Sequence, residues 1–472
     1  PSKDRDRERI DSHDGPYKRF LTISDQLMNI TVLVIEQDPS NEHLFDELIG
    51  VICASLEEVL KGFLDESPQL KRYVQLKHHA RQRLQRDSFE FFRVLGRGAF
   101  GLVSTAQKKD TKMFYAIKVM EKRQIVLKDS YETCKREKDA LSLMNSPFVV
   151  DMKYAFTNDE ALFLVLDICR GGDLQFHLHV CDPKHFSESR AVFYAAEILL
   201  GLEHMHSRDL LYRDLKPNNI LLDDKGHIRI SDFGLVLQLE KKRPDGKRPT
   251  RKWRLAGTPS YWAPETYQAL EQSFASDWWS WGVCVYEMIL GKKPQCRCKK
   301  KLGEWCTFDH KNKRMLKNAT AKGPHASKIR YPPAIFSEES TDLLSKILIR
   351  DPTKRLTVDQ IKQHQFFRTI DWVKLAEKQI IPPFVPNTYD VNAATLGEIG
   401  EFDEKKYKNV VITKEHQKKF ATWEYMNIPA YEEELLTVLQ RNERARKRSI
   451  KPPKPVVKPV KSSSNCPSCI IF

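Results

Sequence analysis

Residues 211–219, LYRDLKPNN, bring three different polar groups close together in the chain. Asp214 supplies a carboxylate that can orient a hydroxyl group and accept its proton. Lys216 supplies a cation, and Asn219 supplies a ligand for a metal ion. Phosphoryl transfer to an alcohol needs these three groups together and preorganised. The run therefore indicates phosphoryl-transfer chemistry.

A second carboxylate follows thirteen residues after Asn219, in residues 232–234, DFG. The glycine permits a tight turn, so Asp232 can face the same site as a second metal ligand. Residues 263–265, APE, close this segment. Because a chance joint occurrence of the three motifs is negligible, we interpret them as parts of one catalytic unit.

A glycine-rich stretch, residues 96–103 with the sequence GRGAFGLV, precedes these motifs. Glycines let backbone N–H groups approach phosphate oxygens closely, although such a hairpin is as often a plain turn. Lys118 follows on a predicted strand, where a buried ammonium requires an anionic partner. Phosphates could supply that partner. So could Glu132, Glu137 or Asp139 of the next predicted helix, and the residues alone do not choose among the three acids.

The composition describes an ordinary globular chain with a strongly basic balance. Its 472 residues exceed what one hydrophobic core usually organises, and 41% are hydrophobic. The net charge of +15 favours anionic partners: nucleic acid, a membrane surface or acidic peptides. The basic clusters lack the interleaved aromatic residues of a nucleic-acid-binding fold, so we expect no nucleic acid.

The cysteines and the apolar segments bear on the compartment. Ten cysteines without regular spacing indicate reduced thiols. Four potential zinc ligands, Cys296, Cys298, Cys306 and His310, lie within fifteen residues, but their spacing differs from the usual zinc knuckle. No secretory leader or run of eighteen apolar residues is seen, so we expect an intracellular protein.

The motifs occupy one part of a chain that we divide into six segments. Strand-like and helical stretches alternate in the segment that holds every motif, and amphipathic helices are predicted on both sides of it. The segments are a disordered or truncated leader (1–40), a helical stretch (41–86), the catalytic unit (87–371), an extended tail (372–412), further helices (413–447) and a basic, proline-rich end (448–472).

Taken in order, the motifs resemble eukaryotic protein kinases over roughly residues 89–370. The resemblance implies an α+β, bilobal fold with a small β-rich N-lobe and a helical C-lobe, using ATP and Mg²⁺. It makes Asp214, Lys216, Asn219 and Thr258 catalytic residues, with Asn219 and Asp232 as metal ligands. Lys216 and Thr258 match serine/threonine kinases rather than tyrosine kinases.

The same resemblance implies an ATP site built from the glycine-rich loop, the lysine strand and a hinge between the lobes. It selects Glu137 as the partner of Lys118, and it assigns bracing roles to Asp277 and to a pair between Glu265 and Arg355. The implied nucleotide-binding residues are Leu95, Gly96, Gly98, Phe100, Gly101, Val103, Ala116, Lys118, Glu137, Leu166, Asp167, Cys169, Asp173 and Leu221.

Narrower features resemble the G-protein-coupled receptor kinases. They include residues 171–174 (GGDL), 193–198 (FYAAEI), 220–232 (ILLDDKGHIRISD) and, after the catalytic unit, 399–404 (IGEFDE). The family inserts its kinase into an all-α regulator-of-G-protein-signalling homology domain, so segments 41–86 and 413–447 would be a partial form of that domain. The alternative is a pair of generic amphipathic helices. The resemblance implies activated receptors as substrates, G-protein subunits as possible partners and a monomer.

The last four residues, CIIF, fit a prenylation motif with Cys469 as the lipid attachment site. The alternative is an ordinary apolar terminus. Cys466 and the basic run 447–461 could give the second signal that stable anchoring needs. We therefore expect a cytoplasmic protein held at the anionic surface of the plasma membrane.

Two competing functions stay open at this point. The chain could phosphorylate soluble acidic substrates, or it could be an idle scaffold for G-protein subunits, which intact Lys118 and Asp214 argue against. Neutral Asn218 stands where arginine-directed relatives carry a glutamate, so we expect acidic Ser/Thr-containing segments as substrates. Asp173 and Glu287 could nevertheless hold a substrate arginine. The receptor, the stimulus and the fate of Cys466 are not determined by the sequence.

Overall fold

A computed structural model describes residues 84–181, 185–239, 255–267, 272–297, 305–307, 329–387, 407 and 409–449. The chain divides into two compact units, and Leu84–Tyr431 forms one of them. The predicted leader, nearly all of segment 41–86, and the tail with Cys466 and Cys469 lie outside the described residues. The regulator-of-G-protein-signalling homology domain therefore stays a prediction.

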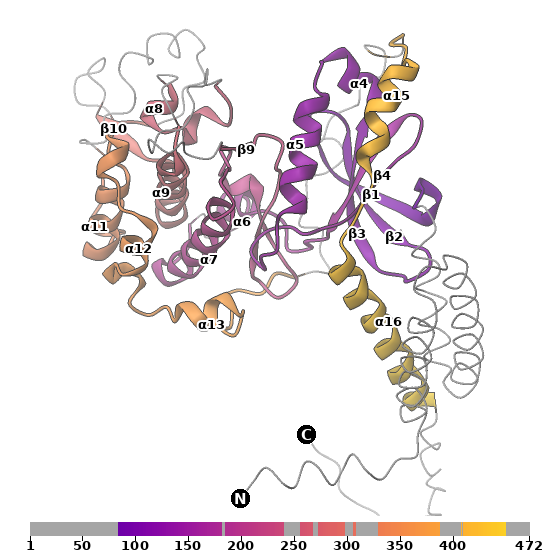
Figure 1. The fold of residues 1–472 in the computed structure, drawn as a ribbon. Coiled ribbons are helices and arrows are strands. Elements are labelled where there is room, and N and C mark those ends of the chain that lie inside the picture. Colours follow the sequence, from indigo (N-terminus) through magenta and orange to yellow (C-terminus); the bar gives the residue numbers. More distant parts are fainter. Residues whose placement is uncertain are drawn as a thin grey trace, which may run out of the picture. The chain divides into compact units, whose positions relative to one another are not determined.

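An antiparallel sheet forms the first half of this unit (Figure 1). Its order is β1-β2-β3-β5-β4-β12. The strands are β1 (Phe89–Arg97), β2 (Leu102–Lys108), β3 (Phe114–Glu121), β4 (Met152–Thr157), β5 (Ala161–Asp167) and β12 (Tyr425–Met426). The central strand β5 buries five consecutive residues, as expected for a strand covered on both faces.

Two helices follow β3 and pack beside the sheet. The short 3-10 helix η1 (Arg86–Ser88) precedes β1, and α4 (Lys122–Leu127) and α5 (Tyr131–Ser142) come after β3. The buried residues of α5 are Cys134, Glu137, Ala140 and Leu141, spaced three, three and one apart along one face. Helical periodicity therefore turns Glu137, and not Glu132 or Asp139, toward the interior.

Helices dominate the second half of the unit (Figure 1). They are α6 (Leu174–His179), α7 (Glu188–His206), α8 (Pro264–Tyr267), α9 (Phe274–Leu290), α11 (Glu338–Ile347), α12 (Val358–Lys362) and α13 (Trp372–Ala376). Both α7 and α9 are buried on nearly all sides, which explains their near-continuous apolar sequence. The expected α+β fold with a sheet-rich lobe and a helical lobe is confirmed.

Short strands and 3-10 turns frame the loops between these helices. The strands pair as β6 (Leu210–Leu211) with β9 (Leu237–Gln238), β7 (Ile220–Leu222) with β8 (Ile228–Ile230), and β10 (Gln295–Arg297) with β11 (Trp305–Thr307). The turns are η2 (Pro217–Asn219), η3 (Pro259–Tyr261), η5 (Pro352–Lys354) and η6 (Gln365–Phe367). Cys296 lies opposite Cys306 in the β10–β11 register, whereas the other two candidate zinc ligands lie outside the described residues.

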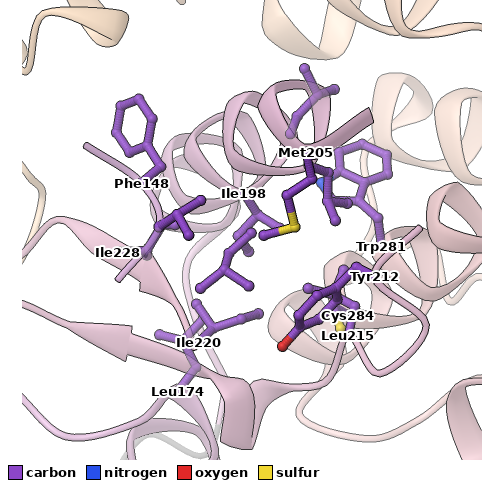
Figure 2. Close-up of a cluster of buried hydrophobic side chains, with 14 of the residues drawn as sticks. Phe148, Leu174, Ile198, Met205, Tyr212, Leu215, Ile220, Ile228, Trp281 and Cys284 are labelled. Atoms are coloured by element: carbon purple, nitrogen blue, oxygen red, sulfur yellow. The ribbon is translucent and has the colours of Figure 1, made fainter. Parts of the chain in front are cut away.

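Tyr212 and Leu215 of the run 211–219 belong to a cluster of buried hydrophobic side chains (Figure 2). Ile198 and Met205 of α7, Trp281 of α9 and Leu215 of the loop itself are each fully buried there. Trp281 also donates its indole N–H to the carbonyl of Ala195 on α7, 3.0 Å away. The loop therefore rests on a rigid, close-packed base.

The segment that follows the catalytic unit returns to the sheet. It contains α15 (Lys414–Phe420), η8 (Ala421–Trp423) and β12, and it continues into α16 (Ile428–Ser449). Tyr425 and Met426 pair with Ala155 and Tyr154 of β4. Residues 413–431, the first part of the predicted segment 413–447, thus belong to the same unit as the sheet. No helix among the described residues is long and apolar enough to cross a membrane.

Candidate active site

Asp214 lies at the centre of a group of polar side chains, with 6% of its surface exposed. Its Oδ1 accepts a hydrogen bond from Thr258 Oγ1 at 2.8 Å, and its Oδ2 lies 2.7 Å from Lys216 Nζ. Lys216 Nζ also donates to Thr258 Oγ1 at 3.0 Å. Three of the predicted catalytic residues are therefore in direct contact, and the carboxylate is held in one orientation.

Asn219 completes this group from the turn η2. Its amide nitrogen donates to the backbone carbonyl of Asp214 at 2.9 Å and to Asp214 Oδ2 at 3.1 Å. Because the nitrogen is used in this way, the amide oxygen is the atom suited to a cation. The fourth predicted catalytic residue thus lies beside the other three, as the sequence predicts.

The backbone before Asp214 is strained and is held by a buried carboxylate. Arg213 has a positive φ of 74°, which residues with a side chain rarely adopt. Asp277 Oδ1 accepts from Arg213 N and Asp277 Oδ2 accepts from Tyr212 N, both at 2.8 Å. His206 Nε2 also lies 2.8 Å from Asp277 Oδ2. The expected bracing role of Asp277 is confirmed by these contacts.

Lys118 forms the second charged centre of the site. Its Nζ lies 2.5 Å from Glu137 Oε1 and 3.5 Å from Asp232 Oδ1. Burial alone would lower the pKa of Lys118, but the adjacent carboxylates of Glu137 and Asp232 raise that pKa above its usual value. The ammonium therefore keeps its charge in a buried position, where it can bind an anion such as a phosphate.

Asp232 contacts the Lys118 centre from the turn at residues 232–234. It has a positive φ of 56°, Gly234 N donates to its Oδ1 at 3.3 Å, and its side chain is 52% exposed. The nearby Lys118 ammonium lowers the pKa of Asp232 below its usual value. An ionised, accessible carboxylate is thus available for a cation or for solvent.

The donor set fits magnesium bound together with phosphates. The described residues contain no cluster of three or more His, Cys, Asp or Glu side chains arranged around a metal. Asp232 and the amide oxygen of Asn219 supply two hard oxygen ligands of the kind that Mg²⁺ prefers. Magnesium usually takes one or two protein ligands and completes its shell with substrate phosphates and water, so the two residues suffice.

The glycines in and beside the turn between β1 and β2 differ in what a side chain at each position would meet. A Cβ atom at Gly101 would lie 1.9 Å from the carbonyl oxygen of Val119, so close packing on β3 requires glycine there. At Gly96 a Cβ atom would meet nothing within 4 Å. Gly98 N donates to the carbonyl of Gly101 at 2.8 Å and closes the turn. Gly96 therefore leaves open space, as a phosphate-binding turn would need, whereas a Cβ atom at Gly98 would lie 3.4 Å from Lys118 Cε.

The predicted nucleotide-site residues come from both lobes. Val103 and Lys118 are partners in the β2–β3 register, and Ala116 and Leu166 are partners in the β3–β5 register. Asp173 forms a bridge with Leu221 of β7. Leu95, Phe100, Asp167 and Cys169 lie on β1, on the turn after it, at the end of β5 and two residues beyond it.

Two residues of this group have perturbed ionisation. Burial raises the pKa of the Cys169 thiol to about 12, so the thiol is neutral and unreactive at physiological pH. Burial also raises the pKa of Asp173, whose Oδ1 accepts from Phe176 N at 2.7 Å and caps α6. The side chain of Asp173 therefore already has a structural partner.

Other charged groups brace the site without facing it. Arg355 Nη1 and Nη2 donate to the two oxygens of Glu265 at 2.6 and 2.7 Å, which confirms the expected pair. A second cluster was not predicted: Glu287 accepts from the Tyr261 hydroxyl at 2.6 Å and lies 3.0 Å from His179 Nε2. Nothing in the spacing of these three residues indicates that they meet, because three different elements bring them together.

Comparison with known proteins agrees with this geometry. The protein kinase domain family matches residues 89–367. The chain is 35% identical over 381 residues to G protein-coupled receptor kinase 4 of Mus musculus, covering 80% of this chain and 63% of that protein. It is 36% identical over 407 residues to Rhodopsin kinase GRK1 of Rattus norvegicus, covering 84% and 67%.

The chain is also 36% identical over 401 residues to Beta-adrenergic receptor kinase 1 of Mus musculus, covering 82% of this chain and 54% of that protein. It thus spans roughly half to two thirds of the length of these relatives.

Proposed function

Because the chain belongs to the protein kinase family, and within it to the G protein-coupled receptor kinases, we propose that it phosphorylates activated G-protein-coupled receptors. In this reaction the γ-phosphate of ATP passes to serine or threonine hydroxyls at the cytoplasmic membrane face, which leads to receptor desensitisation. The contact of Asp214 with Lys216, Thr258 and Asn219 carries the proposal, because these are the groups that the transfer requires.

The chain's own residues divide the chemistry among them. The Asp214 carboxylate orients the substrate hydroxyl and accepts its proton as the oxygen attacks phosphorus. The Lys216 ammonium balances the negative charge of the phosphoryl group during its transfer. Lys118 binds the phosphates that remain on the nucleotide. Asn219 and Asp232 would hold Mg²⁺, and the bound ion would neutralise phosphate charge.

Acidic serine- and threonine-containing segments are the proposed substrates. Glu287 has 1% of its side chain exposed and already contacts Tyr261 and His179, so a substrate arginine has little access to it. Asp173 caps a helix, and Asn218 is neutral. These contacts favour acidic segments over arginine-containing ones.

Attachment to the membrane and binding of G-protein subunits are further parts of the proposal. The prenylation motif at Cys469 and the basic run 447–461 support a peripheral location at the anionic plasma membrane. The family resemblance of segments 41–86 and 413–447, for which helices are predicted from the sequence, supports binding of G-protein subunits, and we propose that the chain acts as a monomer. Membrane attachment and binding of G-protein subunits are both proposed from the sequence motifs and from the family resemblance.

Receptor-containing membranes provide the direct test. The full chain should incorporate radiolabelled phosphate into a purified receptor in vesicles, and an agonist should increase the rate. Equal rates with and without agonist, together with faster phosphorylation of a soluble acidic peptide, would favour the alternative of a kinase for soluble substrates. Absence of phosphate transfer to either substrate would favour the scaffold.

A further inference from the structure

Five polar side chains form a continuous line of contacts that passes through the hinge between the two lobes. Asn427 Nδ2 donates to Asp151 Oδ1 at 3.0 Å, and Lys153 Nζ lies 2.7 Å from Asp151 Oδ2. Lys153 Nζ also lies 3.2 Å from Asp167 Oδ1, and Arg229 Nη1 lies 2.9 Å from Asp167 Oδ2. We call these five residues the hinge chain.

The hinge chain connects three regions that are distant in the sequence. Asn427 follows β12 in the returning segment, and Asp151 and Lys153 stand at the start of β4. Asp167 is the last residue of β5 and the first residue of the expected hinge, residues 167–169. Arg229 is the middle residue of β8, three positions before the metal aspartate, Asp232. The line thus runs from the returning segment, through the hinge, to the strand that leads into the catalytic site.

Backbone hydrogen bonds follow the same line. Asn427 N donates to the carbonyl of Lys153 at 2.9 Å, and Asp167 N donates to the carbonyl of Asp151 at 3.0 Å. Arg229 Nη1 also donates to the carbonyl of Val149 at 3.2 Å. A displacement of β12 would therefore move the backbone of β4 and the start of the hinge together.

The charges of the hinge chain alternate in sign and lie partly out of water. Asp151, Lys153, Asp167 and Arg229 each have only 19–24% of their side chains exposed. Burial alone would lower the pKa of Lys153, but Asp167 and Asp151 raise it, so the ammonium stays charged. Pairs in this setting are screened less by salt than surface pairs, and removing one member leaves its partner without compensation.

We propose that Lys153 and Arg229 are positioning residues through which the returning segment fixes the nucleotide-binding hinge. On this inference, loss of the Asn427–Asp151 contact shifts Asp167 and lowers the affinity for ATP, although neither Asn427 nor Lys153 touches the nucleotide. The inference rests on the proposed function, because that function places the adenine of ATP at the hinge.

Two variants interrupt the hinge chain at different points. Lys153→Met removes the central cation and keeps the length of the side chain. Asn427→Ser removes the amide that reaches Asp151, and serine can still cap the following helix, as Asn427 Oδ1 does for Ala430 N at 3.2 Å. Binding of ATP by the full chain is measured by titration calorimetry, and thermal unfolding is followed in parallel.

Each variant should raise the Kd for ATP roughly fivefold, a typical coupling between connected sites. The double variant should add little to Lys153→Met, because both interrupt one line of contacts. Lys153→Arg, which keeps the cation, should recover most of the affinity. Because serine preserves the helix cap, Asn427→Ser provides the test if Lys153→Met does not fold.

Lys138→Met is the matched control. Lys138 Nζ donates to the carbonyl of Thr422 at 3.3 Å, so it also ties the returning segment to the sheet lobe, but it is not part of the hinge chain. Its Kd for ATP should stay within twofold of the original value.

The inference is overturned if Lys138→Met weakens ATP binding as much as Asn427→Ser. It is also overturned if both hinge-chain variants lose thermal stability but keep their affinity for ATP. Failure of the unaltered chain to bind ATP at all would instead refute the proposed function, so the two results are distinguishable.

Discussion

The catalytic loop and the hinge chain are both clusters of charged residues in close contact, but they are assembled in different ways. Asp214, Lys216 and Asn219 lie within six residues of one another. The hinge chain draws its members from positions between 151 and 427. In the first region the order of residues in the chain already reveals the chemistry. In the second, strand pairing brings together residues whose types alone indicate nothing.

The two regions also differ in what their charges can do. The catalytic site includes an accessible carboxylate, that of Asp232, whose side chain is 52% exposed. Charges in the hinge chain contact one another along its whole length. We therefore expect changes in the first region to alter reaction rates strongly, and changes in the second to alter affinities by small factors.

The largest effect should come from Asp214→Asn. It removes the proton acceptor and leaves the phosphate-binding residues in place, so kcat should fall by roughly 10²- to 10⁴-fold while the Kd for ATP changes little. Steady-state phosphorylation of an acidic peptide and ATP titration measure the two quantities. Asp224→Asn, at an exposed position that takes no part in the proposed site, is the control. A near-normal rate for Asp214→Asn would show that the assigned roles are wrong.

A second large effect is expected at the prenylation motif, whose residues are also consecutive in the sequence. Cys469→Ser removes the proposed lipid attachment site, so partitioning onto anionic vesicles should fall by about two orders of magnitude. Neutral substitutions in the basic run 447–461 should weaken attachment less and in a salt-sensitive way. Vesicle sedimentation of protein made in eukaryotic cells measures both. Unchanged sedimentation of Cys469→Ser would refute prenylation.

An intermediate effect is expected at the proposed metal ligand Asp232, which contacts Lys118. Asp232→Asn removes a charged oxygen ligand, so the Mg²⁺ concentration needed for half-maximal ATP binding should rise roughly 10- to 100-fold. Nucleotide titrations at several Mg²⁺ concentrations measure it. Binding of ATP without Mg²⁺ should change less. An unaltered Mg²⁺ requirement would remove Asp232 from the metal site.

The smallest effects concern the choice of substrate. One variant changes Asn218 in the run 211–219, and the other changes His179, which contacts Glu287 from a distant helix. Asn218→Glu should raise kcat/KM for peptides with arginine before the acceptor serine by about fivefold, since a carboxylate near the peptide favours a cation. His179→Ala should raise it by about twofold, because it frees one oxygen of buried Glu287. Peptide sets with Asp/Glu or Arg, assayed at low and high salt, measure the preference. Arginine peptides that are already preferred by the unaltered chain would contradict the acidic preference.

Much of the catalytic site could be predicted because its residues follow each other at short, fixed spacings. Residues 211–219 form one short run, so the closeness of Asp214, Lys216 and Asn219 follows from chain spacing alone. Distant Asp277 and Thr258 then hold this run in place. The lobes could be expected for a similar reason, since strand and helix periodicities are local properties. The same patterns, taken together, were enough to indicate the family that comparison with known proteins then showed.

Pairings between distant elements could not be predicted in this way. The sequence offered three acids for Lys118, and only the packed face of α5 shows that Glu137 is the partner. Glu287 looked available to a substrate arginine until its contacts with Tyr261 and His179 were known. The sequence by itself determined which chemistry this chain can carry. The tertiary structure decided which charges meet, because electrostatic contact depends on distances of a few ångströms that chain spacing does not set.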